Sequence, residues 1–443
     1  LELANTSSIT SAARLVHAKK RTTVIVFQAF RYELDPNNAQ RSALASHAGA
    51  ARYAWNWGLA RVKEALDARR AEISSGAAPC TEIPDAMTLS RSWNVWKKQP
   101  GNCSWWAANS KCTYQEAFRD LDRALRTFYS SRRRVKRRPV GFPRFKKKGR
   151  HDHFRLYGII RVDEHTVVLP RIGRVRLKEQ TSKFAGRILS ATCKREADRW
   201  FVSLCVEVDR PDPLPVAGPA IGVDLGVSAF AVCSDGRVIE APRPFAKGSR
   251  KLRRLNKNVS RTQRGSRNRA KAVLKAACHH RKIRNQRRDA LHQATTSLAK
   301  TKSVIVVENL NVAGLMRNHH IARQIADLGW GEFHWQLSYK TRWYGSQLVV
   351  ADRFYPSSKI CSGCGHIMAS LPLFRRTFIC ESCGLVIDRD LNAAKNLARL
   401  ADRVAPGSGE TGNACGEGGT GIPGDGGVKL PSTKQEPASV SSP

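Results

Sequence analysis

Two Cys-x-x-Cys pairs impose the strongest constraint on how this chain folds. Cys361 and Cys364 form the first pair, Cys380 and Cys383 form the second, and a short spacer separates the pairs. This arrangement is typical of a zinc ribbon, because thiolates are soft ligands and zinc accepts four of them in tetrahedral geometry. Four protein ligands leave no open position for a reactant. The pattern therefore predicts a structural zinc ion, not a catalytic one.

A glycine follows the second cysteine of each pair. Gly365 and Gly384 suit the tight turn that directs backbone N–H groups at the sulfurs, since glycine adopts left-handed conformations without steric cost. Four unrelated buried cysteines are the alternative interpretation, and the regular spacing disfavours it. We therefore expect a zinc ribbon over residues 357–386.

A helix is predicted directly after the ribbon. Residues 391–403 (LNAAKNLARLADR) are rich in Ala and Leu and carry basic residues towards their end, as helices do. Asp388 and Asp390 stand at the start of this run. An acidic residue at a helix start commonly caps the helix. One of the two is therefore expected to be a cap, and the other is available for a different role.

Two further acidic residues stand at the ends of apolar runs. Asp224 ends the run 221–223, and Glu308 follows the β-branched run 303–307. A carboxylate at such a position is costly unless it is paired or bound to a metal. Three carboxylates are the set that a two-metal phosphodiesterase site needs, in which two hard divalent cations about 4 Å apart stabilise the attacking and leaving oxygens.

Four motifs, taken together and in this order, carry a resemblance to a known family. They are GVDLGV, VVENLNVAGL, the SSKICSGCG…CESCG ribbon and DRDLNAAKNL. The chain resembles the RuvC-like nuclease of the transposon-encoded TnpB family, the OrfB proteins of insertion sequences, which are related to type V CRISPR effectors. Any one motif would be a weak signal, whereas the ordered combination is specific. The resemblance extends over about residues 23–403.

The resemblance implies an activity, partners and site residues. It places the metal-binding catalytic acids at Asp224, Glu308 and Asp390, with Mg²⁺ or Mn²⁺ as the catalytic ion. Asp390 is chosen because the family pattern puts the acid two residues before the Asn of NAA, and Asp388 is the alternative. The implied function is an RNA-guided DNA endonuclease that takes a guide RNA and double-stranded DNA as partners. A catalytically silent RNA-guided repressor and a transposase that joins DNA strands itself are the other candidates, and a CRISPR-associated role is also open.

The charge of the chain points to the same class of partner. The 443 residues include 76 Lys and Arg against 36 Asp and Glu, a formal net charge of +40. Self-repulsion of this size is tolerable when a polyanion neutralises it, so nucleic acid is the leading partner. No apolar run of transmembrane length and no signal peptide is present, so no membrane partner is expected. The remaining cysteines show no paired framework, which fits a reducing cytoplasm.

The predicted fold is a multidomain mixture of α/β and α+β parts. An RNase H-like (RuvC) nuclease domain with an inserted zinc ribbon is expected to follow an amino-terminal β-barrel with an inserted helical region. The expected boundaries are a disordered leader at 1–22, a nucleic-acid-binding lobe at 23–208 with helix-turn-helix-like helices at 36–138, a Pro-rich linker at 209–219, the nuclease at 220–403 and a disordered tail at 404–443.

Several local elements are expected within these parts. Residues 23–34 are predicted to form a strand, followed by a helix with Asp35 as cap and Pro36 at its first position. That helical region is expected to break near Gly49. Tyr53, Trp55 and Trp57 are candidates for stacking on bases, and core packing between helices is the favoured interpretation for Trp55 and Trp57. Further expectations are a basic helical pair at 247–288, a helix at 321–344 and a strand at 347–354.

Basic segments supply the candidate nucleic-acid contacts. A run of like charges is commonly a solvated face, but prolines, Phe142 and Phe145 alternate with the cations of residues 141–150, which favours an ordered contact. The excess of one sign in the basic helical pair likewise favours a surface that faces phosphates. The candidates are Arg132, Arg133, Arg134, Arg144, Lys146, Lys147, Lys148, Arg253, Arg254 and Arg261.

Overall fold

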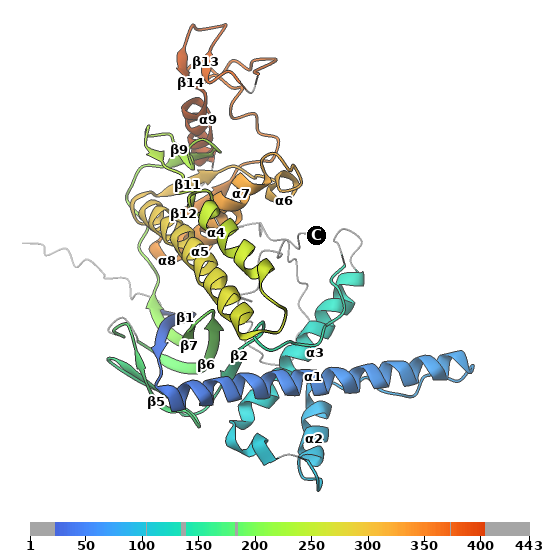
Figure 1. Cartoon of the computed structure of the whole chain (residues 1–443). Coiled ribbons are helices and arrows are strands. Elements are labelled where there is room, and N and C mark those ends of the chain that lie inside the picture. The colour runs from blue at the N-terminus through green and yellow to red at the C-terminus, as the bar shows by residue number, and fades with distance from the viewer. Residues whose placement is uncertain (1–22, 103, 134–138, 182–184, 373, 404–443) are drawn as a thin grey trace, which may run out of the picture.

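Two β-sheets and the helices around them form the framework of the protein (Figure 1). The computed structural model describes residues 23–102, 104–133, 139–181, 185–372 and 374–403. The leader predicted at 1–22, the tail predicted at 404–443 and Arg134 lie outside the described residues. Among the helices that are described, none combines the length and the apolar character needed to span a membrane.

The first sheet is antiparallel and has seven strands in the order β2-β6-β7-β1-β5-β4-β3. Strands β1 and β7 pair along nearly their whole length, from Thr23 opposite Pro211 to Leu34 opposite Trp200. Within the described residues the hydrogen-bonded order is open, running from β2 to β3, so strand pairing alone does not close the predicted barrel. The strands are β1 (Thr23–Asp35), β2 (His153–Leu156), β3 (Arg161–Asp163), β4 (Thr166–Leu169), β5 (Gly173–Leu177), β6 (Arg187–Glu196) and β7 (Arg199–Pro211).

A helical region is inserted between β1 and β2. It consists of α1 (Asn38–Ser74), α2 (Ala86–Trp96), the 3-10 turn η1 (Ser104–Ala108) and α3 (Lys111–Arg133). The apolar residues of α3 recur at helical spacing, and Phe118 and Leu121 are fully buried against α1. Trp55 and Trp57 pack in this helical core, as predicted, whereas Tyr53 is 41% exposed.

Helix α1 corrects two expectations. It runs without a break through Gly49, because its flanking alanines are buried in two hydrophobic cores at once and this burial offsets the helix-weakening effect of one glycine, about 1 kcal/mol. Its cap is Asn37, which forms a capping box with Gln40. Asp35 is not the cap, since it still pairs with Arg176 as the last residue of β1.

The second sheet has five strands in the order β10-β9-β8-β11-β12. Strands β8, β11 and β12 run parallel, whereas β9 pairs antiparallel with β8 and β10 pairs antiparallel with β9. The parallel strands are almost continuous apolar runs because both of their faces are covered. Their ranges are β8 (Ile221–Leu225), β9 (Ala231–Cys233), β10 (Val238–Ile239), β11 (Val304–Val307) and β12 (Gln347–Val350).

Helices cover this sheet and supply the long basic hairpin of Figure 1. The hairpin consists of α4 (Pro244–Arg261) and α5 (Arg267–Thr301), and the buried residues of α5 join the core of the second sheet. The helix predicted at 321–344 is in fact two helices, α7 (Ala322–Leu328) and α8 (Trp330–Tyr344). Gly329 separates them because its left-handed conformation, φ 74°, ends one helix and begins the next.

Two strand limits also differ from expectation. Strand β12 ends at Val350, not at residue 354, because the side chain of Asp352 accepts a hydrogen bond from the backbone N–H of Phe354 and closes a turn there. Strand β7 continues to Pro211, so the Pro-rich segment predicted to link two domains begins inside the sheet. The pairing of β7 with the start of β1 holds these residues extended.

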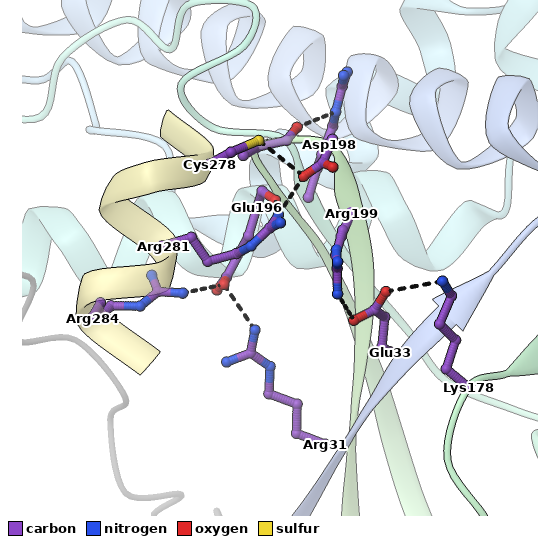
Figure 2. Close-up of polar contacts among 11 residues, drawn as sticks. Arg31, Glu33, Lys178, Glu196, Asp198, Arg199, Cys278, Arg281 and Arg284 are labelled. Atoms are coloured by element: carbon purple, nitrogen blue, oxygen red, sulfur yellow. Dashed lines mark hydrogen bonds and ion pairs between the residues drawn. The ribbon is translucent and has the colours of Figure 1, made fainter. Parts of the chain in front are cut away.

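The turn between β6 and β7 contacts helix α5 through a network of charged residues (Figure 2). The carboxylate of Glu196 pairs with Arg31 of β1 at 2.9 Å and with Arg284 of α5. Arg281 of α5 donates to the Glu196 carbonyl oxygen at 2.6 Å and to Asp198 at 2.5 Å. These bonds join the first sheet to the helix that covers the second.

Candidate metal centres and nucleic-acid interface

The four cysteines of the two Cys-x-x-Cys pairs come together in the structure. All four sulfurs lie within 4.8 Å of one another, and the Cys361–Cys383 and Cys364–Cys380 sulfurs are each 3.6 Å apart. Four sulfurs placed about 2.3 Å from one zinc ion at tetrahedral angles would be about 3.8 Å apart. The donor set and its spacing therefore fit zinc, as predicted from the spacing.

The backbone of the cluster has the turns that the sequence predicts. Gly365 and Gly384 adopt φ values of 82° and 73°, the left-handed region that favours glycine. The backbone N–H of Gly363 donates to the Cys361 sulfur at 3.3 Å. Burial on its own raises the pKa of the Cys361 thiol, but backbone N–H groups and the neighbouring thiols lower that pKa to about 6. Cys361 is therefore readily available as a thiolate ligand.

Two buried asparagines attach helix α9 (Arg389–Ala398) to the ribbon. Asn392 donates to the carbonyl oxygen of Ile360 at 2.7 Å and accepts from the N–H of Ser362 at 2.9 Å. Asn396, one turn later, donates to the carbonyl oxygens of Ser357 and Ile360. Because residues four apart share one face of a helix, both asparagines reach the same loop. The ribbon thereby fixes the start of α9, where Asp390 lies.

A glycine allows α9 to pack directly on strand β8. A Cβ atom placed on Gly222 would lie 2.0 Å from the carbonyl oxygen of Ala394 and 2.5 Å from the backbone nitrogen of Ala398. Any larger residue would push the helix away from the strand. This close approach sets Asp390 of the helix and Asp224 of the strand at the same end of the sheet.

Asp224, Glu308 and Asp390 are brought together from three elements, the end of β8, the residue after β11 and the first turn of α9. Burial raises the pKa of Asp224 well above its usual value, and the charges of Glu308 and then Asp390 raise it further. The three carboxylates are not drawn together as tightly as the four sulfurs, which form the one compact ligand cluster among the residues described. Two ions about 4 Å apart suit a more open set of oxygens.

The chemistry of this donor set fits hard divalent cations. Carboxylate oxygens are the ligands that Mg²⁺ and Mn²⁺ take in proteins. A partly desolvated acidic cluster of this kind repels itself when it is ionised, and a bound cation relieves that repulsion. The Arg389 charge opposes the rise in the pKa of Asp224 but does not outweigh burial and the two neighbouring acids, and Arg376 pairs with Asp390 at 3.6 Å.

Asp388 and Asp390 have different surroundings. Asp388 is the cap of α9, and its carboxylate accepts from the N–H groups of Asp390 at 3.0 Å and Leu391 at 2.9 Å. Asp388 is exposed, whereas the Asp390 side chain is only 25% exposed. The charge of Asp390 also raises the pKa of Asp224. The structure thus places the cap and the cluster acid on separate residues of the pair.

Ser357 is a site residue that sequence reasoning missed. Its hydroxyl donates to Glu308 at 2.7 Å, and the residue is 5% exposed. This bond fixes the orientation of the Glu308 carboxylate. The only signal in the sequence is the position of Ser357 just before the first ribbon cysteine, which does not indicate a contact with a residue so distant in the chain.

The basic segment 139–148 is ordered along helix α1. The indole of Trp55 donates to the carbonyl oxygen of Arg144 at 3.0 Å, and Asn56 exchanges two hydrogen bonds with the backbone of Lys146. The Lys146 ammonium lies 3.8 Å from the centre of the Trp55 ring. Arg144, Lys147 and Lys148 are exposed. The segment therefore docks on α1 and leaves three of its four candidate cations exposed, and its contact with nucleic acid stays a prediction.

The other candidate cations lie on helix surfaces. Arg132 and Arg133 are exposed at the end of α3, where the Arg132 guanidinium lies 4.6 Å from the centre of the Phe128 ring. Arg253, Arg254 and Arg261 are exposed on α4, and none of them pairs with an acidic residue in the described part of the chain. Arg261 also lines an open depression of about 350 Å³ between α4 and α5 with Lys271 and Lys275. Cations in excess over acids make both surfaces suitable for phosphates.

Three family models match successive parts of the chain. Residues 26–71 match a "Helix-turn-helix domain" of the OrfB_IS605 type, residues 203–319 match OrfB_IS605, described as "Probable transposase", and residues 330–397 match the "Cas12f1-like, TNB domain". The solved Cas12f1–sgRNA–target DNA complex is more distant, with a TM-score of 0.33 and 14% identity over 85% of this chain and 100% of that one.

Curated relatives match this chain over most of its length and over most of their own. "Putative RNA-guided DNA endonuclease Rv2885c" of Mycobacterium tuberculosis is 36% identical over 85% of this chain and 86% of its own length. "Putative RNA-guided DNA endonuclease InsQ" of Escherichia coli is 30% identical over 88% of this chain and 94% of its own length. The chain therefore belongs to the OrfB family of the IS605 type, the TnpB family that its motifs resemble.

Proposed function

We propose that this chain is a transposon-encoded, RNA-guided DNA endonuclease that cleaves phosphodiester bonds by divalent-metal-assisted hydrolysis. The observation that carries the proposal is the convergence of Asp224, Glu308 and Asp390 from β8, the end of β11 and α9. Relatives of nearly the same length that are named RNA-guided DNA endonucleases support the guided reaction.

The sheet order supports an RNase H-like (RuvC) nuclease over residues 220–403. Three antiparallel strands followed by two parallel ones, in the order β10-β9-β8-β11-β12, are the arrangement of that fold. We further propose that residues 23–208 form the nucleic-acid-binding lobe and that residues 209–219 join the two parts. Phe154 of β2 and Val167 of β4 share one hydrophobic core, which supports a barrel-like curl of the first sheet.

The three acids would hold two Mg²⁺ or Mn²⁺ ions, which when bound stabilise the attacking and leaving oxygens of the reaction. Asp224 contributes a carboxylate from a strand that cannot shift, because α9 packs on its backbone at Gly222. Ser357 holds the carboxylate of Glu308 in one orientation. Zinc in the ribbon has a separate role, since the ribbon fixes the first turn of α9 and with it Asp390.

The partners are a guide RNA and double-stranded DNA in the cytoplasm. Base pairing between the guide and the target strand would read sequence, and the protein would bind the backbone of the duplex. The exposed cations of segment 139–148 and of α4 are suited to that contact, because each neutralised phosphate releases counterions. The formal charge of +40 supports a large polyanionic partner.

A transposase that joins DNA strands itself is the second candidate, favoured by the description of the matching family model. One experiment separates the two. The protein is purified from its host, and the RNA that copurifies is sequenced. A discrete RNA that ends in a variable segment supports guided cleavage, and a transposon-end DNA that is joined to a target without any RNA supports the transposase. Target binding without any cut would instead support a repressor.

A further inference from the structure

Arg376 of the ribbon reaches the acidic cluster from outside it. Its Nη1 atom lies 3.6 Å from the Asp390 carboxylate, and its Nη2 atom lies 3.4 Å from the hydroxyl of Ser228, in the loop that follows β8. The residue immediately precedes β13 (Thr377–Ile379), which pairs with β14 (Val386–Asp388). One side chain thus bridges the ribbon, the helix that carries Asp390 and the loop that follows the strand of Asp224.

The backbone of Arg376 is fixed, whereas its guanidinium is held weakly. Its carbonyl oxygen accepts from the N–H of Arg389 at 2.7 Å, and the Arg389 side chain donates to the carbonyl oxygen of Pro372 at 3.2 Å. The ion pair with Asp390, at 3.6 Å, is longer than a good hydrogen bond. The side chain of Arg376 is 61% exposed and that of Asp390 is 25% exposed. The cation therefore covers Asp390 on the side that is open to solvent.

A divalent cation held by Asp390 would compete with Arg376 for the same carboxylate. The positive charge of that cation would repel a guanidinium at the present distance. The released guanidinium would remain on the solvent-exposed side of Asp390, where it could contact the phosphate backbone of a substrate. Arginine is well suited to that exchange, because its planar donors match a phosphate as well as a carboxylate.

We propose that Arg376 is a displaceable counter-ion of Asp390, which neutralises this acid in the metal-free protein and contacts a nucleic-acid phosphate once the metal has taken its place. The inference rests on the proposed metal-binding role of Asp390. Arg376 would then be a positioning residue of the acidic cluster. The ribbon would contribute this side chain to the cluster in addition to fixing helix α9.

The test measures metal binding without nucleic acid. Zinc-loaded full-length protein is titrated with Mn²⁺ by calorimetry, as wild type, Arg376→Ala, Arg376→Lys and Arg375→Ala. Arg375 is the matched control, since it is an exposed neighbour of the same charge with no acidic partner among the described residues. Removal of the competing cation is expected to tighten Mn²⁺ binding about two- to fivefold in Arg376→Ala. Arg375→Ala is expected to leave it unchanged.

At saturating metal, the Arg376→Ala substitution that tightens Mn²⁺ binding is expected to slow cleavage. Arg376→Ala is expected to lower kcat about tenfold or more while KM for the target is unchanged, and Arg376→Lys is expected to recover part of kcat. A variant that is merely unstable would weaken metal binding as well as cleavage. Tighter binding combined with slower cleavage therefore supports the proposal.

Two results would overturn it in distinguishable ways. If Arg376→Ala binds Mn²⁺ as wild type or Arg375→Ala does, while Asp224→Asn abolishes that binding, the counter-ion role is wrong and the metal centre stands. If wild type and Asp224→Asn bind Mn²⁺ equally, the acidic cluster is not the metal site, and the proposed function fails together with the inference.

Discussion

Gly222 of strand β8 lies so close to Ala394 of helix α9 that a Cβ atom on the glycine would be 2.0 Å from the Ala394 carbonyl oxygen. The contact involves backbone on both sides, so neither partner can move a side chain out of the way. It is the reason that an acid on a strand and an acid on a helix far away in the sequence reach one site.

Gly222→Ala is therefore expected to destabilise the protein by about 3 kcal/mol, because the helix has to shift to admit the methyl group. Cleavage should fall further than stability alone explains, since the shift also moves Asp390. Gly331→Ala is the control, as a Cβ there meets nothing within 4 Å. Chemical denaturation and cleavage of both variants are compared. Equal stability of the two variants would show that the packing of α9 on β8 is not as close as described.

Ser357→Ala is expected to lower cleavage or metal affinity about 10- to 100-fold, the usual effect of removing a group that orients a metal ligand. The hydroxyl of Ser357 bonds to Glu308 at 2.7 Å, and alanine leaves that carboxylate without its donor. Ser358→Ala alters the adjacent residue, for which no contact to the acids is seen among the described residues. Indistinguishable cleavage by the two variants would remove Ser357 from the site.

Replacement of Cys361 and Cys380 by Ser is expected to reduce bound zinc from about one ion per chain and to lower cleavage with it. The link to cleavage is the pair of asparagines that tie α9 to the ribbon loop. Cys80→Ser is the control, because Cys80 is exposed, its thiol donates to Glu72 at 3.2 Å, and it is not a member of the sulfur cluster. Full zinc content in the double variant would contradict the ribbon assignment.

Neutralising Lys147 and Lys148 should weaken binding of nucleic acid and flatten its salt dependence. Each lost phosphate contact reduces the slope of log K against log salt by about 0.7 to 0.9. Arg70→Gln is the control, because Arg70 is exposed but already pairs with Asp67 at 3.0 Å. Binding of nucleic acid is measured from low to high salt for Lys147→Gln, Lys148→Gln and Arg70→Gln. A slope unchanged from wild type would identify segment 139–148 as a solvated surface.

The sequence was most informative where chemistry depends on spacing. Two Cys-x-x-Cys pairs predicted the sulfur cluster, and acids at the ends of apolar runs predicted Asp224 at the end of β8 and Glu308 directly after β11. Such patterns work because a metal ligand or a strand end is determined by a few neighbouring residues. The capping role of Asp388 was likewise expected for one of the two acids before α9.

Features that depend on tertiary contacts were not predictable in the same way. The continuity of α1 through Gly49 depends on two cores that bury its flanking residues, which no local propensity records. The bond between Ser357 and Glu308 and the approach of Arg376 to Asp390 join segments distant in sequence. The sequence places a glycine at position 329, but only the fold shows that Gly329 adopts the left-handed conformation that divides α7 from α8.

Asp224, Glu308 and Asp390 are proposed to hold the divalent ions that cleavage of DNA requires. Asp224→Asn, Glu308→Gln and Asp390→Asn should each abolish cleavage and leave target binding intact, because affinity comes from the basic surfaces and from base pairing. The folded-state pKa of Asp224 is raised, so its ionisation destabilises the metal-free fold at any pH above the unfolded-state pKa. Asp224→Asn should therefore melt no lower than wild type without metal.

The most direct measurement is cleavage of a plasmid with a matched target by the protein–RNA complex in Mg²⁺. Asp388→Ala is the control, which should lose about 1 kcal/mol of stability with its cap and still cut. We expect wild type and Asp388→Ala to cut the plasmid, and the three cluster variants to bind the target without cutting it. Cleavage by Asp224→Asn at the wild-type rate, or loss of cleavage in Asp388→Ala with retention in Asp390→Asn, would contradict it.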